Sequence, residues 1–432
     1  MVTMNESELG RVLLTHRGVQ WIIGTKDDPY ALLVRAAGDD PHRLGELIRE
    51  RGPLYRSSAE AWVTAHHEIA AAALADPRLS VRHPDADAPA AQDEGEQREP
   101  MPWEVPALRE ILPFEGAFLT AGRADCERVR DLLEPLLGAK ALERLRPVAE
   151  RELRRALAGA GGGAGGGFDL RTEVADPFAA AIVRELLGVP EEDHDRFAAL
   201  RRGAAGLLDA TVCSPHLRTA RELIASVEGM RSLIAGLIAQ RREEPGDDLV
   251  SALLAATHED EVRSVCTLLA LVGTELSATL FCDAVAELLD RPAQWRALCE
   301  DPGLAAAVVE ETLRHAPPVR LVPLYALEDL ELAGTPVPAG GQVVVAVEAA
   351  GRDSAVHAEP AAFDPARERT AEPLVFAGGL PTSLPAPTAR FLAEAGLRAL
   401  AAGAPGLRPA GPVLRRLRSA VTGAVIEQPV AR

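Results

Sequence analysis

LAAAVVEETLRHAPPV, residues 304–319, is the stretch that decides the fold of this 432-residue chain. It predicts a helix over 304–315, on which Glu311 and Arg314 lie three residues apart on one face and form a charge pair. Such a pair can also hold a third partner from a later loop. Two segments follow it, VPAGGQVVVAVEAAGRD and then AAFDPAR, which ends at Arg367. This order of segments argues against an ordinary surface pair.

Amphipathic helix is the dominant pattern in the rest of the chain. Between Leu223 and Ile238 the apolar residues recur at steps of three and four, which places them on one face of a helix. Further helices are predicted at 128–159, 177–188 and 262–290.

Strand patterns are fewer and shorter. AWVTA (61–65) alternates between apolar and polar residues, while LYALEDLELAG (324–334) and QVVVAVEAA (342–350) flank the turn residues 336–341 and are predicted to pair. The sequence therefore predicts a mainly α protein with small β-sheets.

Composition restricts the function classes. The chain is 47% hydrophobic and 25% charged, which is typical of a soluble globular protein. A net charge of −18 argues against a nucleic-acid partner, which would require clustered cations. The opening residues hold no apolar signal segment, and no run of about 18 apolar residues appears, so a cytoplasmic protein without a membrane partner is expected. The five cysteines are scattered, which predicts neither a zinc site nor a disulfide framework.

Two stretches are predicted to be flexible loops within a single domain spanning 1–432. Residues 83–106 are rich in Pro, Asp, Glu and Gln and have little periodicity. GAGGGAGGG (159–167) is of low complexity and lacks the GK[ST] that a phosphate-binding loop requires, so it is predicted to be a link between helices.

From residue 304 onward the order of motifs resembles that of bacterial cytochromes P450. Other stretches share the resemblance, which extends over almost the whole chain: ADPFAAAIVRELLGVP (175–190), PGDDLVSALLA (245–255), GTELSA (273–278) and PGLRPAGPVLRRLRS (405–419). The resemblance implies the mostly helical P450 fold, with Glu311, Arg314 and Arg367 as the structural ion network of the family.

The loop FAGGLPTSLPAPTAR (376–390) departs from the heme-binding loop of that family. Phe376, Gly379, Ala389 and Arg390 fit the family pattern. By the resemblance, the expected first glycine is Ala377, the histidine is Pro381, the cysteine is Ser383 and the following glycine is Pro385. A thiolate is a soft, anionic, electron-donating ligand of heme iron, whereas a serine hydroxyl stays protonated at neutral pH. The sequence predicts a P450-like fold that lacks a functional heme site.

Two further positions on separate helices agree with this interpretation. The acid–alcohol pair that relays protons to bound oxygen in the family is Glu275 followed by Leu276, so the alcohol is lost. The position that usually gives a propionate-binding histidine is Cys126, although Arg128 and Arg130 keep the family spacing. With the ligand, relay and propionate positions all changed, we expect no cofactor and no catalytic residue.

A subset of the family resembles this chain more closely than the active enzymes do. LGRVLLTHRGVQWIIGTKDDPYALLVRAAGDDP (9–41) is similar to the N-terminal segment of the auxiliary proteins that activate deoxysugar glycosyltransferases in macrolide and anthracycline biosynthesis. By that resemblance the chain is a noncatalytic protein that binds, stabilises and allosterically activates a TDP-deoxysugar glycosyltransferase in a hetero-oligomer. Trp21 and Tyr30 are the candidate partner contacts, because aromatic residues are enriched at interface centres.

Two other hypotheses remain open at the level of sequence. One is a P450-like enzyme with residual or unusual heme binding. The other is a heme-free enzyme that uses the old pocket around Glu275. No metal site is expected, because His66 and His67 are adjacent and would point to opposite faces of a strand.

Overall fold

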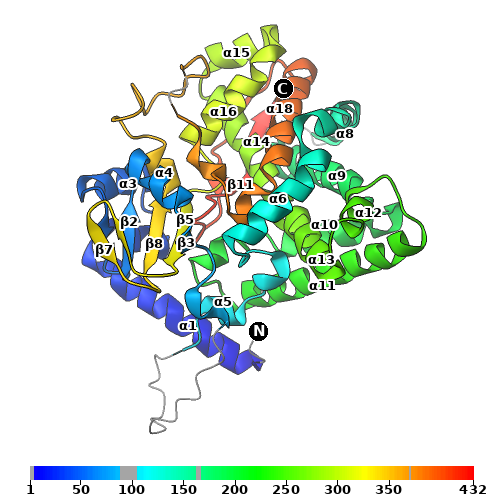
Figure 1. Ribbon diagram of the computed structural model, residues 1–432. Helices are drawn as coiled ribbons and strands as arrows, with labels where there is room; N and C mark the ends of the chain where they lie inside the picture. Colours follow the sequence, from blue (N-terminus) through cyan, green and yellow to red (C-terminus); the bar gives the residue numbers. More distant parts are fainter. Residues whose placement is uncertain (1–3, 88–104, 162–166, 369–370) are drawn as a thin grey trace.

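The computed structural model describes residues 4–87, 105–161, 167–368 and 371–432. Figure 1 shows a small sheet on one side of the molecule and a larger helical part on the other. The predicted mainly α fold with small sheets is confirmed. Of the two predicted loops, residues 88–104 and 162–166 lie outside the described residues.

The helices have the following bounds: α1 Glu6–Ile23, α2 Pro29–Arg35, α3 Pro41–Glu50, α4 His67–Ala75, α5 Leu108–Ile111, α6 Arg123–Leu137, α7 Ala139–Glu143, α8 Arg146–Gly159, α9 Asp176–Leu187, α10 His194–Gly203, α11 Leu217–Glu243, α12 Leu249–Leu254, α13 Glu259–Leu268, α14 Thr274–Leu289, α15 Pro292–Glu300, α16 Ala305–His315, α17 Val347–Ala350 and α18 Ala386–Gly403. A π-helical turn, Leu269–Gly273, joins α13 to α14.

The helix predicted over 128–159 is in fact three helices, α6, α7 and α8. Gly138 ends α6 with an extended backbone conformation, and a Cβ built there would lie 2.6 Å from the carbonyl oxygen of Glu134. A side chain at this turn would collide with that oxygen, so the turn requires glycine. The apolar periodicity continues through the break, which is why the sequence pattern missed it.

The main sheet has five strands in the order β1 (Tyr55–Arg56), β2 (Ala61–Thr64), β8 (Gln342–Ala346), β5 (Leu321–Ala326) and β3 (Leu79–Ser80). β5 and β8 pair antiparallel with Leu324 opposite Val343, and β2 runs parallel to β8. The predicted β2 is therefore confirmed.

The connection between β5 and β8 differs from the expectation. Residues 330–337 form a separate hairpin of β6 (Leu330–Leu332) and β7 (Thr335–Val337), because Ala333 and Gly334 both adopt positive φ and close a tight turn. Residues 347–350, expected to continue β8, form the short helix α17.

Four small C-terminal strands complete the fold. β12 (Pro429–Ala431) pairs with β4 (Gly167–Asp169) and with β9 (Arg408–Pro409), and β10 (Leu414–Arg415) pairs with β11 (Val425–Glu427).

The core centres on α14, of which almost every residue is buried. It packs against α18 and α9, where the Phe178 and Phe281 rings meet edge to face with centroids 6.2 Å apart. A Cβ built on Gly396 of α18 would lie 2.8 Å from the ring of Phe281 on α14, so this glycine permits the close approach of α14 and α18. Among the described residues, only the span from Glu259 to Leu289 is long and apolar enough to cross a membrane, and its apolar stretch is entirely buried in this core.

Candidate functional site: a heme site that no longer fits heme

The charged residues of α16 lie together in a buried network. Arg314 Nη2 lies 2.6 Å from Glu311 Oε1, and Arg367 Nε lies 3.5 Å from the same oxygen. Arg314 also donates to the carbonyl oxygens of Gly351, Pro360 and Ala362. Burial raises the pKa of Glu311, but the hydrogen bonds from Arg314 and from the Asp364 amide, together with the charges of Arg314 and Arg367, outweigh this and hold the pKa below its usual value. The network fastens the loop after α17 to α16.

The loop at 376–390 holds no group that could ligate iron. Residues Pro381–Ser383 form a 3₁₀ turn that leads into α18. Ser383 is buried, and its hydroxyl donates a 2.6 Å hydrogen bond to the carbonyl oxygen of Leu380. The side chain at the position of the expected thiolate is thus a neutral donor engaged within its own loop.

The start of α18 packs against the central helix. A Cβ built on Gly273, in the π-helical turn before α14, would lie 3.1 Å from the Cβ of Pro385, so the Pro385 ring contacts that helix at the end of the degenerate loop. Because Ser383 offers a neutral hydroxyl that is hydrogen-bonded within its own loop in place of a thiolate, the residues present do not fit a thiolate-ligated heme.

The position expected to contact a heme propionate is also occupied by a side chain that cannot do so. Cys126 is buried in α6, its thiol lies 3.7 Å from the carbonyl oxygen of Ala121, and burial raises its pKa to about 12. Arg128 pairs with Glu261 of α13, and Arg123 donates to the carbonyl oxygens of Leu74 and Gly378. Both arginines are therefore engaged by protein groups.

Glu275 is the centre of a second buried ion network. Arg171 Nη2 lies 2.7 Å from its Oε2, and Arg416 Nη2 lies 3.1 Å from its Oε1. Arg171 also contacts Asp176, and Arg416 approaches Asp209. Although burial raises the pKa of Glu275, the charges of the arginines outweigh this and lower it to about 2.

The sequence interpretation missed this second network. Arg171 and Arg416 are 104 and 141 residues from Glu275, so no local spacing brings them together. Leu276, at the position of the family alcohol, is fully buried.

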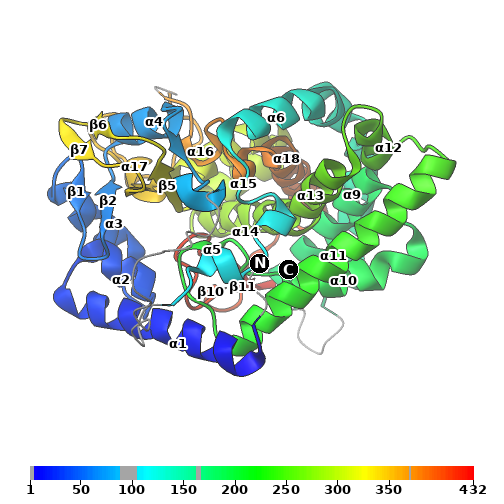
Figure 2. The ribbon, with the colours of Figure 1, turned by 60° about the horizontal axis from the view of Figure 1, so that its bottom comes forward.

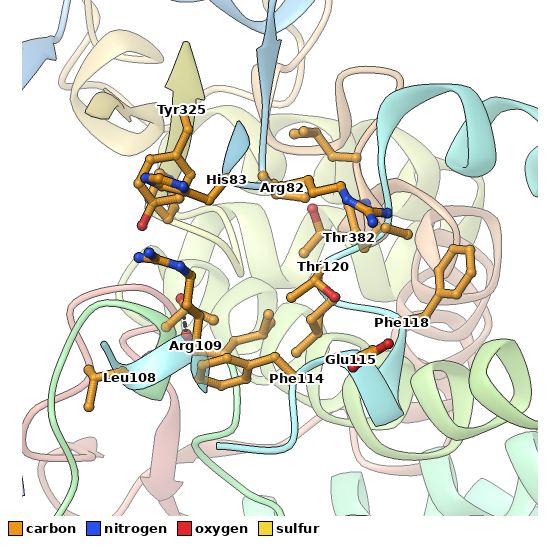
Figure 3. Close-up of a pocket in the computed structure, with 18 of the residues that line it drawn as sticks. Arg82, His83, Leu108, Arg109, Phe114, Glu115, Phe118, Thr120, Tyr325 and Thr382 are labelled. Atoms are coloured by element: carbon orange, nitrogen blue, oxygen red, sulfur yellow. Dashed lines mark hydrogen bonds between the residues drawn. The ribbon is translucent and has the colours of Figure 1, made fainter. Parts of the chain in front are cut away.

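A cavity of about 1070 Å³ remains beside the degenerate loop. Figure 3 shows His83 and Tyr325 at the upper left of the cavity, Thr382 and Thr120 near its centre, and Phe114 below them. Residues of α14, Glu275 among them, do not line it. Glu275 is therefore a structural group that is charged at neutral pH and lies away from the cavity. A general acid or base would have to line the cavity and exchange a proton near neutral pH.

The two candidate partner contacts lie in different environments. Trp21 of α1 is 57% exposed, whereas Tyr30 of α2 is only 2% exposed and packs in the small core cluster beside the sheet. Of these two residues, only Trp21 is available at the surface.

His66 and His67 lie at the start of α4, and no group of three or more potential metal ligands occurs in the described parts of the chain.

Comparison with known proteins agrees with this architecture. The family model described as "Cytochrome P450" matches residues 231–369. Protein AknT of Streptomyces galilaeus is 44% identical, with 98% of this chain and 96% of AknT covered. Protein DesVIII of Streptomyces venezuelae is 34% identical, with 99% of this chain and 94% of DesVIII covered.

Solved structures give the same result at the level of fold. P450BioI, crystallised with an acyl carrier protein ligated to hexadec-9Z-enoic acid, superposes with a TM-score of 0.77 at 26% identity, covering 91% of this chain and 98% of that one. The chain therefore belongs to the cytochrome P450 family and, within it, to the P450-like glycosyltransferase auxiliary proteins.

Proposed function

We propose that this chain is a noncatalytic auxiliary protein that binds a TDP-deoxysugar glycosyltransferase of macrolide or anthracycline biosynthesis and holds it in its active conformation. The two proteins act together in the cytoplasm as a hetero-oligomer. No cofactor takes part.

The observation that carries the proposal is Ser383 at the position of the expected thiolate, with its hydroxyl hydrogen-bonded to the carbonyl oxygen of Leu380 in its own loop. The ion network of α16 and the packed α14 support the proposal, because they belong to the framework of the fold rather than to a reaction site. Similarity to AknT and DesVIII extends over nearly the full length of each chain. A protein that keeps a fold and loses its chemistry acts through its surface.

The energetics of such activation are modest. A partner that binds only the competent state of an enzyme raises the population of that state by its differential binding free energy, and about 3 kcal/mol changes the ratio of states by roughly a hundredfold. An ordinary protein interface can provide this.

The test is coexpression of this chain with a glycosyltransferase whose gene lies near its own. We expect the two proteins to copurify, the soluble yield of the glycosyltransferase to rise, and glycosyl transfer to be faster than with the glycosyltransferase alone. Iron analysis of the purified chain should give far less than one iron per molecule. Absence of both a complex and a change in rate would refute the proposal.

A further inference from the structure

The outer face of α1 is an apolar surface that the described chain does not cover. Leu14, Trp21 and Ile22 are 62%, 57% and 63% exposed. Together with Arg11 and Gly18 they recur at steps of three and four, so they lie on one face of the helix. We call these five residues the α1 face. Single exposed apolar residues are common, but several exposed apolar side chains on one helix face, such as Leu14, Trp21 and Ile22, indicate an interaction site.

The inner face of α1 is fastened along its length, so the exposure of the α1 face is a fixed feature. Glu6 pairs with Arg221 of α11 at 2.9 Å, and the hydroxyl of Ser214 donates to the carbonyl oxygen of Leu13. Gln20 donates to the carbonyl oxygen of Val212 at 2.8 Å. Figure 2 shows α1 along one edge of the molecule, with α2 and one end of α11 on its inner side.

The side chain of Trp21 is held in place although it is exposed. The guanidinium carbon of Arg35 lies 5.4 Å from the indole centroid, and Arg35 is itself held by Asp39 at 2.9 Å and by the carbonyl oxygen of Gly24. An indole fixed in this way loses little conformational entropy on binding, which is typical of an interface anchor. One turn before it, a Cβ built on Gly18 would meet no atom within 4 Å, so the helix surface beside the anchor is open.

Charge indicates what kind of surface the α1 face takes. Residues 9–26 contain Arg11, Arg17 and Lys26 but no acidic residue, although 64 of the 432 residues in the chain are acidic. A second copy of this chain docked symmetrically would bring the same basic residues against each other. The complementary surface is instead an apolar patch with acidic residues at its rim.

We propose that the α1 face is the docking surface for the glycosyltransferase, and that it takes an apolar, acid-rimmed patch of that partner. This inference rests on the proposed function, and the following experiment separates the two.

The experiment measures the dissociation constant of the full chain for the glycosyltransferase by calorimetry, together with the rate of glycosyl transfer. Gly18→Gln adds a side chain to the α1 face at a position where a built Cβ meets no atom, and Ile22→Asp places a charge among the exposed apolar residues. Each is expected to weaken binding at least about 30-fold, as is typical of residues at an interface centre, while the melting temperature stays near that of the wild type. The matched controls are Gly236→Gln on α11, where a built Cβ also meets no atom, and Leu327→Asp at another exposed apolar residue. Both should bind within twofold of the wild type.

The outcomes are distinct. If the wild type binds and activates but Gly18→Gln and Ile22→Asp do so equally well, the α1 face is not the docking surface and the activator function stands. If the wild type neither binds nor activates, the proposed function fails and this inference fails with it. Loss of self-association in Ile22→Asp, or its loss of binding to vesicles of anionic lipid to which the wild type binds, would assign the face to a second copy or to a membrane and would also overturn the inference.

Discussion

Ser383 and Pro385 differ in what each contributes to the loss of heme. Ser383 removes the iron ligand, and its hydroxyl satisfies the carbonyl oxygen of Leu380 instead. Pro385 places a ring against Gly273 of the central helix at the end of the same loop. Restoring the thiolate at 383 alone leaves this ring in place.

Ser383→Cys should therefore not recover a heme protein. Expressed with excess heme precursor, the variant is expected to show no thiolate–heme absorption band and much less than one iron per chain. An active cytochrome P450 prepared in parallel serves as the positive control. One iron per chain in Ser383→Cys would show that the loop can still accommodate the porphyrin.

Glu275→Gln should destabilise the fold by about 3–5 kcal/mol, because it leaves the buried Arg171 without its main counter-charge. The measurement is equilibrium unfolding in urea at neutral pH. The same substitution at an exposed carboxylate outside the network, Glu228→Gln on α11, should change the stability far less.

The stability contributed by Glu275 should also depend on pH. Its pKa is lowered from 4.5 to about 2 on folding, so the carboxylate stabilises the fold at pH above 4.5 and this contribution is lost as pH falls toward 2. The shift corresponds to about 3 kcal/mol at 1.36 kcal/mol per unit. Unfolding measured between pH 5 and 2 should show a smaller pH dependence in Glu275→Gln than in the wild type, and equal slopes would contradict the assignment.

At the scale of elements, the α16 network joins a helix to a loop that has no regular structure of its own. Glu311 Oε1 accepts a 2.8 Å hydrogen bond from the backbone amide of Asp364, and Arg314 holds three carbonyl oxygens of the same region. The loop between α17 and Arg367 therefore depends on two side chains of α16 for its position.

Glu311→Ala should release this loop. The Asp364 amide loses its acceptor, so its hydrogen exchange should be faster by at least tenfold, while amides of α11 exchange as in the wild type. The comparison is made by hydrogen-exchange mass spectrometry on matched peptides. Unchanged exchange at Asp364 would mean that other contacts hold the loop.

The sequence predicted the helices and strands that are determined by neighbouring residues. The amphipathic pattern and the Glu311–Arg314 spacing predicted α16, and the period-two pattern predicted β2, because neighbouring residues decide both. Gly138 was missed as a break, because the apolar period continues across it. The partners of Glu275 could not be predicted, because they come from segments more than 100 residues away that only the fold brings together. Tyr30 is predicted as a contact from its residue type and its place in the N-terminal segment, and neither determines burial.

At the scale of the whole molecule, the retained core and the degenerate heme-binding loop together favour a protein that works by binding. In Figure 1, α1 lies at the lower edge of the molecule, whereas α14 and α18 lie in its upper part. The α1 face is therefore separate from the degenerate loop, which leads into α18. Changes at the old site should therefore leave partner binding intact as long as the fold is stable.

The central claim is tested most directly by the initial rate of glycosyl transfer at a fixed concentration of the glycosyltransferase, measured as iron-depleted chain is added. The rate should rise and reach a plateau as the partner becomes saturated, and Ser383→Ala should give the same curve as the wild type. A rate that does not change on addition of the chain, or that rises only when heme is supplied, would contradict a heme-free activator.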